Sequence, residues 1–134
     1  MQTILIVDDS KFMRLANERA LIKAGFKVIT AGDGEQALQL ASTHVPDLIV
    51  LDMLLPKVAG LDVLKSLRQN PDTALVPVIV LSSLAQSNEV KLISEGATAY
   101  FEKAKLGLDK SSDALLEIIQ GMTTVNSKPV GKKQ

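Results

Sequence analysis

The feature that most constrains the fold is an alternation of short apolar runs with segments of helical spacing along all but the end of the 134 residues. Five short segments, most of them rich in Ile, Val and Leu, are predicted to be strands: 3–7, 27–31, 48–51, 78–81 and 98–102. Three of these are continuous apolar runs, which are typical of strands covered on both faces. The chain length suits one domain.

Segments of helical periodicity lie between and after these strands. In the first, Ser10 is a favourable N-cap and Gly25 lies just past the expected end. Its turns are marked by Phe12, Leu15, Ala16, Arg19, Ala20 and Lys23. The others are a helix over about 35–43, one through Leu61, Leu64 and Leu67 that Pro71 stops, one over about 88–95 closed by Gly96, and one through Leu115, Ile118, Ile119 and Met122.

Strict alternation with short connections predicts a doubly wound α/β fold, in which five helices cover both faces of a five-stranded parallel sheet. In such a sheet, functional groups gather at the carboxyl ends of the strands, near the point where strand order reverses. Residues 1–122 are expected to form this domain. The polar stretch 123–134 is expected to be a disordered tail or the start of a linker.

Composition narrows the possible environments. Fifteen basic and fifteen acidic side chains balance, which argues against bulk attraction to nucleic acid or to an anionic membrane. Without cysteine, disulfides and thiolate metal sites are excluded. No apolar stretch approaches the roughly 18 residues that span a bilayer. These features favour a soluble cytoplasmic domain.

Polar residues stand at the ends of four predicted strands. They are Asp8 and Asp9 after the first, Asp52 after the third, Ser82 and Ser83 after the fourth, and Lys103 after the fifth. Each also has a purely structural interpretation, as a helix cap, a loop acid or a solvated lysine. Because the carboxyl ends of parallel strands share one edge, the combination favours a functional site over these separate explanations.

The chemistry of this set indicates an acyl-phosphate site. Three clustered carboxylates repel one another unless a cation intervenes, and Mg²⁺ (or Mn²⁺) prefers such oxygen ligands together with a phosphate oxygen. One carboxylate can then act as the nucleophile, because the metal neutralises charge on the incoming phosphoryl group. Lys103 would supply a positive charge and Ser82 a hydroxyl donor to the phosphoryl oxygens.

Over about residues 2–122 the chain resembles the response regulator receiver family of two-component signalling. The matching motifs are the pair Asp8-Asp9, the segment 52–60, Ser82 and Lys103. The resemblance implies the CheY-like strand order 2-1-3-4-5 and a phosphoacceptor at Asp52. It also implies a metal shell in which Asp9 binds directly, Asp8 binds largely through water, and the backbone carbonyl of Leu54 contributes.

The resemblance further implies a signalling role rather than an enzymatic one. Ser82 and Lys103 would bind the phosphoryl group, and Ser82 with Tyr100 would form the switch. The donor would be a sensor histidine kinase or a histidine phosphotransfer protein, and the output partner is not indicated. For Tyr100 the alternative is a half-buried strand aromatic with its hydroxyl in water.

Three positions depart from the usual pattern or affect the lifetime of the phosphorylated state. Ala104 replaces the proline that usually follows the lysine, and because a cis bond before a non-proline residue costs about 2.5–4 kcal/mol, a trans bond is expected there. Leu54 and Leu84 occupy the positions two beyond the acceptor and two beyond the hydroxyl, which the resemblance implies line the approach of the hydrolytic water. Both are apolar and cannot hold a hydrolytic water, so a long-lived phosphorylated state is expected.

Three other classes remain as alternatives. An aspartate-dependent phosphatase usually has a D-x-D arrangement rather than Asp8-Asp9, and the two carboxylates would repel a flavin phosphate in a flavodoxin-type carrier. A degenerate receiver would have lost an acid or the lysine. The single histidine, His44, is expected to be an exposed helix-end residue and not a phosphotransfer group.

Overall fold

Short strands of apolar residues form a five-stranded parallel sheet in the order β2-β1-β3-β4-β5, as predicted. The strands are β1 (Thr3–Val7), β2 (Lys27–Ala31), β3 (Leu48–Asp52), β4 (Val78–Ser82) and β5 (Ala99–Glu102). In this computed structural model, residues 2–53, 55, 59–82, 89–103 and 113–127 are described. The order reverses between β1 and β3, so the ends of these two strands are where the topology predicts a site.

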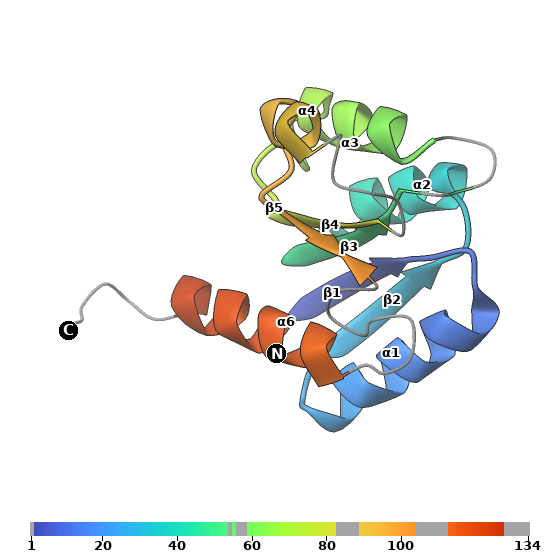
Figure 1. Ribbon diagram of the computed structural model, residues 1–134, viewed down its shortest axis with the longest axis vertical. Helices are drawn as coiled ribbons and strands as arrows, with labels where there is room; N and C mark the ends of the chain where they lie inside the picture. Colours follow the sequence, from blue (N-terminus) through green and yellow to red (C-terminus); the bar gives the residue numbers. More distant parts are fainter. Residues whose placement is uncertain (1, 54, 56–58, 83–88, 104–112, 128–134) are drawn as a thin grey trace.

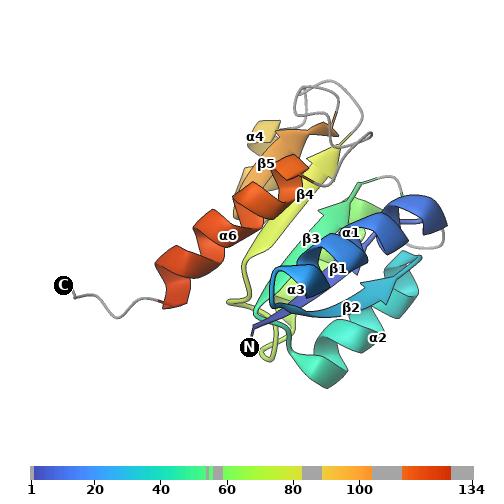
Figure 2. The same cartoon turned by 90° about the horizontal axis from the view of Figure 1, so that it is seen from below.

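Helices cover both faces of the sheet (Figure 1). They are α1 (Lys11–Lys23), α2 (Gly34–His44), α3 (Gly60–Gln69), α4 (Glu89–Ser94) and α6 (Asp113–Ser127). Figures 1 and 2 show α1 and α6 on one face and α2, α3 and α4 on the other. The described part of the chain therefore contains the five strands and five helices that the alternation predicts.

The core is divided by the sheet into two layers. Successive side chains of a strand point to opposite faces, so Leu5 and Val7 of β1 pack with the α2–α4 layer, while Ile4 and Ile6 pack with the α1–α6 layer. Every residue of β3 and β4 is buried. This burial on both faces explains why these two strands are continuous apolar runs in the sequence.

The observed boundaries of two strands differ from the predicted ones at functionally important points. Strand β3 includes Asp52 and β4 includes Ser82, one residue further than predicted in each case. Both polar residues are buried, with exposed fractions of 4%. The predicted strands end one residue earlier because an apolar pattern does not include a polar residue at a strand end.

Helix α6 continues to Ser127, five residues past Met122, so residues 123–127 are helical and not a disordered tail. The remainder of the predicted tail, 128–134, lies outside the described residues. The domain boundary at residue 122 stays a prediction.

Helix α1 begins and ends as predicted but buries a different face. The Ser10 hydroxyl accepts a hydrogen bond from Met13 N at 3.2 Å, and Gly25 follows the helix with a φ of 101°. Phe12, however, is 77% exposed, and the residues buried on α1 are Asn17 and Leu21. The apolar spacing alone does not predict which face of α1 is buried, because this helix carries apolar residues on more than one face.

Candidate functional site

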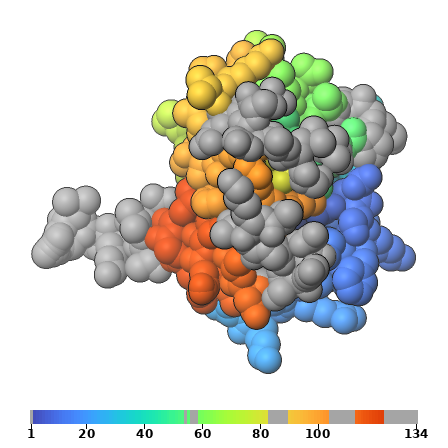
Figure 3. Space-filling model, viewed as in Figure 1, coloured from blue at the N-terminus to red at the C-terminus, as the bar shows by residue number. Residues whose placement is uncertain are grey.

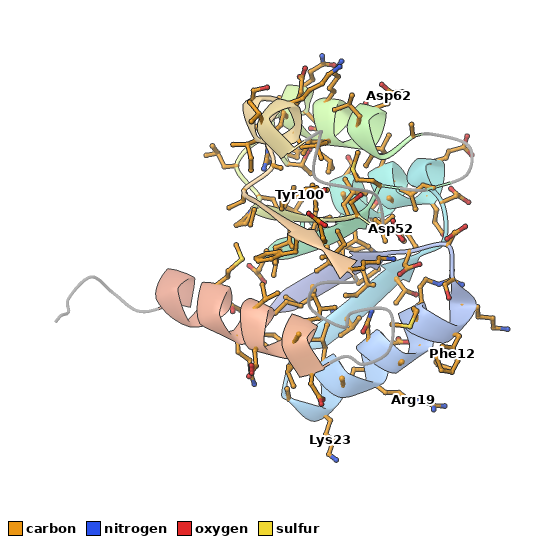
Figure 4. The ribbon with its side chains drawn as sticks, viewed as in Figure 1. Phe12, Arg19, Lys23, Asp52, Asp62 and Tyr100 are labelled. Carbon is orange, nitrogen blue, oxygen red and sulfur yellow. The ribbon has the colours of Figure 1, made fainter. Side chains whose placement is uncertain are left out.

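Three carboxylates from two adjacent strand ends form an acidic cluster. Asp8 and Asp9 follow β1, and Asp52 ends β3, which lies directly beside β1 in the sheet. One carboxylate oxygen from each of the three lies within 4.8 Å of the others. Asp8 and Asp52 are buried and Asp9 is exposed, so the cluster is open to solvent on the Asp9 side. Figure 4 labels Asp52 at the end of its strand.

Lys103, which follows β5, reaches into the acidic cluster. Its Nζ donates a hydrogen bond to Asp52 Oδ2 at 2.7 Å and lies 3.6 Å from Asp8 Oδ2. Its side chain is only 15% exposed, so the ammonium group is held between the two buried carboxylates. The structure therefore joins the ends of β1, β3 and β5 through direct contacts of three predicted site residues, Asp8, Asp52 and Lys103.

The turn after β1 is organised by Ser10 and Arg14. Ser10 N donates to Asp8 Oδ1 at 2.9 Å, and Arg14 Nη1 donates to the Asp8 backbone oxygen at 2.8 Å. Because Ser10 is the N-cap of α1, neither Asp8 nor Asp9 caps this helix. The structural interpretation of the acidic pair as helix caps is therefore wrong.

Burial and charge shift two pKa values in the cluster. Desolvation raises the pKa of Asp8, with the negative charges of Asp52 and Asp9 acting in the same direction, although the Ser10 hydrogen bond and Lys103 oppose it. For Lys103, burial lowers the pKa, but the hydrogen bond and charge of Asp52 together with Asp8 outweigh burial and raise it overall. Lys103 is therefore charged at neutral pH. Burial disfavours the ionised form of the Asp8 carboxyl group.

Ser82 and Tyr100 lie on the neighbouring strands β4 and β5, Ser82 at the carboxyl end of its strand and Tyr100 two register positions further back. Ser82 is the last residue of β4 and pairs in register with Glu102, and Tyr100 pairs with Val80. The Tyr100 ring packs against the core layer of α2–α4. Its hydroxyl is buried and has no hydrogen-bond partner within the described part of the chain. The alternative of a hydroxyl in water is therefore wrong.

The donor set fits a hard divalent cation. Carboxylate oxygens are the ligands that Mg²⁺ prefers, and three of them within 4.8 Å carry a charge that one ammonium group offsets only in part. No other group of three potential metal-ligating side chains occurs among the residues described. The predicted backbone ligand Leu54 lies outside the described residues, as do Ser83, Leu84 and Ala104.

His44 stands apart from this cluster. It is the last residue of α2 and is exposed, and the chain then enters β3, whose far end carries Asp52. His44 therefore lies toward the opposite edge of the sheet, as expected. Arg14, in contrast, contacts the backbone of the cluster and was not predicted, because no sequence pattern specifies an arginine bonded to a backbone carbonyl.

A family model described as "Response regulator receiver domain" matches residues 4–129. A gliding motility regulatory protein of Myxococcus xanthus is 40% identical over 114 residues, covering 84% of this chain and 14% of that protein. The alkaline phosphatase synthesis transcriptional regulatory protein PhoP of Bacillus subtilis is 41% identical over 101 residues, covering 75% of this chain and 41% of that protein. The chain therefore belongs to the response regulator receiver family.

Solved structures agree with this membership. The receiver domain of Francisella response regulator 1452 matches with a TM-score of 0.82 and 27% identity, covering 95% of this chain and 100% of that chain. The chemotaxis protein CheY4 of Vibrio cholerae matches with a TM-score of 0.79 and 28% identity, covering 90% of this chain and 97% of that chain. The CheY-like fold with strand order 2-1-3-4-5 is thus confirmed.

This chain spans only part of the length of the curated relatives: 14% of the gliding motility regulatory protein and 41% of PhoP. Among the described residues, no helix is both long and apolar enough to cross a membrane. The family is one of signalling phosphoacceptors in two-component systems and not of classical enzymes.

Proposed function

We propose that this domain accepts a phosphoryl group on Asp52 in a Mg²⁺-dependent reaction (Mn²⁺ being an alternative cation) and thereby switches an output surface. The observation that carries the proposal is the environment of Asp52. This buried carboxylate at the end of a central strand lies within 4.8 Å of two further carboxylates and 2.7 Å from the Lys103 ammonium. Nucleophile, metal ligands and a phosphoryl-binding cation are thus present in one cluster.

The residues of the cluster have distinct roles in this transfer. An Asp52 oxygen forms a bond to phosphorus while the bond from phosphorus to the donor's leaving group breaks, and its electron pair leaves with the donor. Asp8, Asp9 and Asp52 would hold the cation, which when bound neutralises charge on the phosphoryl oxygens. Lys103, already directed at Asp52, would exchange its carboxylate partner for a phosphoryl oxygen, and the Ser82 hydroxyl would donate to another.

We infer that the physiological donor is a sensor histidine kinase or a histidine phosphotransfer protein, and that this signalling takes place in the cytoplasm. The start of α1 follows the acidic pair directly and carries the exposed Phe12 (77%) and Leu15 (42%). Figure 4 shows Phe12 directed away from the sheet, and Figure 3 shows α1, in blue, at the molecular surface. Exposed apolar side chains beside the site are suited to contact a donor protein.

Switching would be transmitted from Asp52 through Ser82 to Tyr100 and α4. With beryllofluoride as a phosphoryl analogue together with Mg²⁺, amide resonances of Ser82, Tyr100 and residues 89–94 are expected to shift along with those of the acidic cluster. Beryllofluoride without Mg²⁺ serves as the control and should leave them in place. Shifts restricted to residues 8, 9 and 52 would contradict a working switch.

The remaining alternatives are less well supported by the same residues. A flavin carrier would have to place a phosphate against Asp8 and Asp9, whose negative charges repel it. A receiver that only binds a partner would not need Lys103 bonded to Asp52, and the acidic cluster and the lysine are both present. An aspartate-dependent phosphatase is less well supported because this chain has the adjacent pair Asp8-Asp9 in place of the D-x-D arrangement that such enzymes usually have.

The phosphorylated state is expected to be long-lived because Leu54 and Leu84 cannot hold the attacking water. The double change Leu54→Asn with Leu84→Glu should accelerate loss of the phosphoryl group about tenfold or more, which corresponds to about 1.4 kcal/mol of barrier. Intact mass measured over time in Mg²⁺ reports the decay. If the wild-type protein already decays as fast as the double variant, the two leucines do not control access of water.

A further inference from the structure

Arg14 folds back from the first turns of α1 onto the acidic pair. Its backbone nitrogen donates to Ser10 O at 2.9 Å, and its Nη1 donates to Asp8 O at 2.8 Å. This carbonyl belongs to the peptide group that joins Asp8 to Asp9. The arginine therefore contacts one of the two peptide groups that set the direction in which the Asp9 side chain leaves the backbone.

Gly32, just after β2, provides the space for this guanidinium group. A Cβ placed on Gly32 would lie 2.9 Å from Arg14 Nη1 and 3.4 Å from Cζ, so the guanidinium lies directly against the glycine. The φ of Gly32 is not in the left-handed region, so an alanine there would add a methyl group without backbone strain. Gly32 and Arg14 thus form a contact between the turn after β2 and the start of α1.

The backbone of Asp8 is held on both sides by these elements. Its N–H donates to Ala31 O at 3.1 Å, and its carbonyl accepts from Arg14. Asp8 is buried, and its carboxylate accepts a further hydrogen bond from Ser10 N. Asp9 is exposed, so the direction of its carboxylate depends on the peptide that precedes it. A fixed peptide lowers the entropic cost of bringing the Asp9 oxygen to a cation.

We propose that Arg14 is a positioning residue for the cation site: it fixes the Asp8–Asp9 peptide so that the Asp9 carboxylate is directed toward those of Asp8 and Asp52. The inference rests on the proposed function, because it assumes that the acidic cluster binds Mg²⁺. Residues that orient metal ligands typically change metal affinity by about 10- to 100-fold when they are replaced.

The direction of the change in Mg²⁺ affinity distinguishes a positioning role of Arg14 from a purely electrostatic one. Arg14 carries a positive charge close to the cluster, and if charge alone mattered, its removal would strengthen the binding of a cation. If Arg14 acts by holding the peptide, its removal weakens binding instead. Arg14→Met removes the charge and the hydrogen-bond donor but keeps a side chain of similar length. Arg14→Lys keeps the charge and one hydrogen-bond donor, so it should restore most of the Mg²⁺ affinity.

The experiment is a Mg²⁺ titration of the full 134-residue chain, followed by the amide resonances of Asp8, Asp9 and Asp52. Arg14→Met is expected to weaken binding about tenfold. The matched control is Arg19→Met, because Arg19 is exposed on the same helix and is directed away from the sheet (Figure 4), and its affinity should stay close to that of the wild type.

Gly32→Ala tests the same contact from the opposite side. Its methyl group should displace the guanidinium and weaken Mg²⁺ binding, but it should have no further effect in the Arg14→Met background, where the arginine is already absent. The Gly32→Ala and Arg14→Lys variants keep the test decisive if Arg14→Met does not give a folded spectrum. Additive effects of Gly32→Ala and Arg14→Met would contradict the proposal.

The titration distinguishes a cluster that binds no Mg²⁺ from a Mg²⁺ site that Arg14 does not position. If the wild-type chain binds no Mg²⁺, the metal role of the cluster is wrong, and with it the role of Arg14. If the wild type binds Mg²⁺ and Arg14→Met binds it equally or more tightly, only the positioning role is overturned. Equal weakening by Arg14→Met and Arg19→Met would also overturn it, because the loss of affinity would then not depend on the contact with the Asp8 carbonyl.

Discussion

Replacing Asp52 by asparagine is expected to abolish phosphorylation of the domain. Incubation of the wild-type chain with a small acyl phosphate and Mg²⁺ should add one phosphoryl group, which intact mass measures directly. Asparagine has nearly the shape of aspartate but lacks the anionic oxygen that attacks phosphorus, so the loss should be essentially complete. The Lys103 ammonium can still donate to the amide oxygen, which favours retention of the fold.

The matched control for this variant is Asp62→Asn. Asp62 is an exposed carboxylate in the first turn of α3, outside the acidic cluster, and Figure 4 shows it at the surface of that helix. The same acid-to-amide change there should leave labelling unchanged. Equal labelling of Asp52→Asn and the wild type would remove Asp52 as the acceptor.

Mg²⁺ is expected to stabilise the wild-type domain, and Asp9→Ala should lose most of this gain. A ligand present at ten times its Kd stabilises the folded state by about 1.4 kcal/mol, which is roughly a 5 °C rise in Tm for a domain of this size. Asp9 is the exposed member of the cluster, so its removal should weaken the site with little effect on metal-free stability. Thermal unfolding with and without Mg²⁺ measures both quantities.

Asp8→Asn provides a contrasting variant, because the folded-state pKa of Asp8 is raised by burial. A raised pKa means that protonated Asp8 stabilises the folded state at low pH, and that this contribution is lost as the pH rises through the folded-state pKa. At neutral pH the metal-free Asp8→Asn domain should therefore be more stable than the wild type. It should also respond less to Mg²⁺. A lower metal-free stability of Asp8→Asn at pH 7 would contradict this account.

Much of the fold could be predicted because its strands are buried on both faces. Strands β3 and β4 are continuous apolar runs for this reason, and strict alternation with helices leaves few topologies other than a parallel sheet. The meeting of Asp8, Asp9, Asp52 and Lys103 followed from the same rule, since parallel strands bring their carboxyl ends to one edge. The contact of Lys103 with Asp52 is the tertiary contact that supports this inference most directly.

Hydrogen bonds from arginine side chains to particular backbone carbonyls could not be predicted. Arg14 is bonded to the Asp8 carbonyl, and Arg68 donates to Gly96 O at 2.8 and 2.9 Å and to Val76 O at 2.7 Å. Because every residue carries a backbone carbonyl, the sequence holds no signal for which one an arginine contacts. The buried face of α1 was missed for a related reason. Asn17 is buried there while Phe12 is exposed, and polarity alone predicts the reverse.

The most direct test of Asp52 as the acceptor is chemical localisation of the phosphoryl group. Borohydride reduces an aspartyl phosphate to homoserine, and digestion with trypsin yields the peptide 28–57, which contains Asp33, His44, Asp47 and Asp52. Fragment masses from the phosphorylated and reduced wild-type chain should place homoserine at position 52, and only when Mg²⁺ was present. Homoserine at position 8 or 9, or a phosphoryl group retained on His44 with position 52 unmodified, would contradict the account.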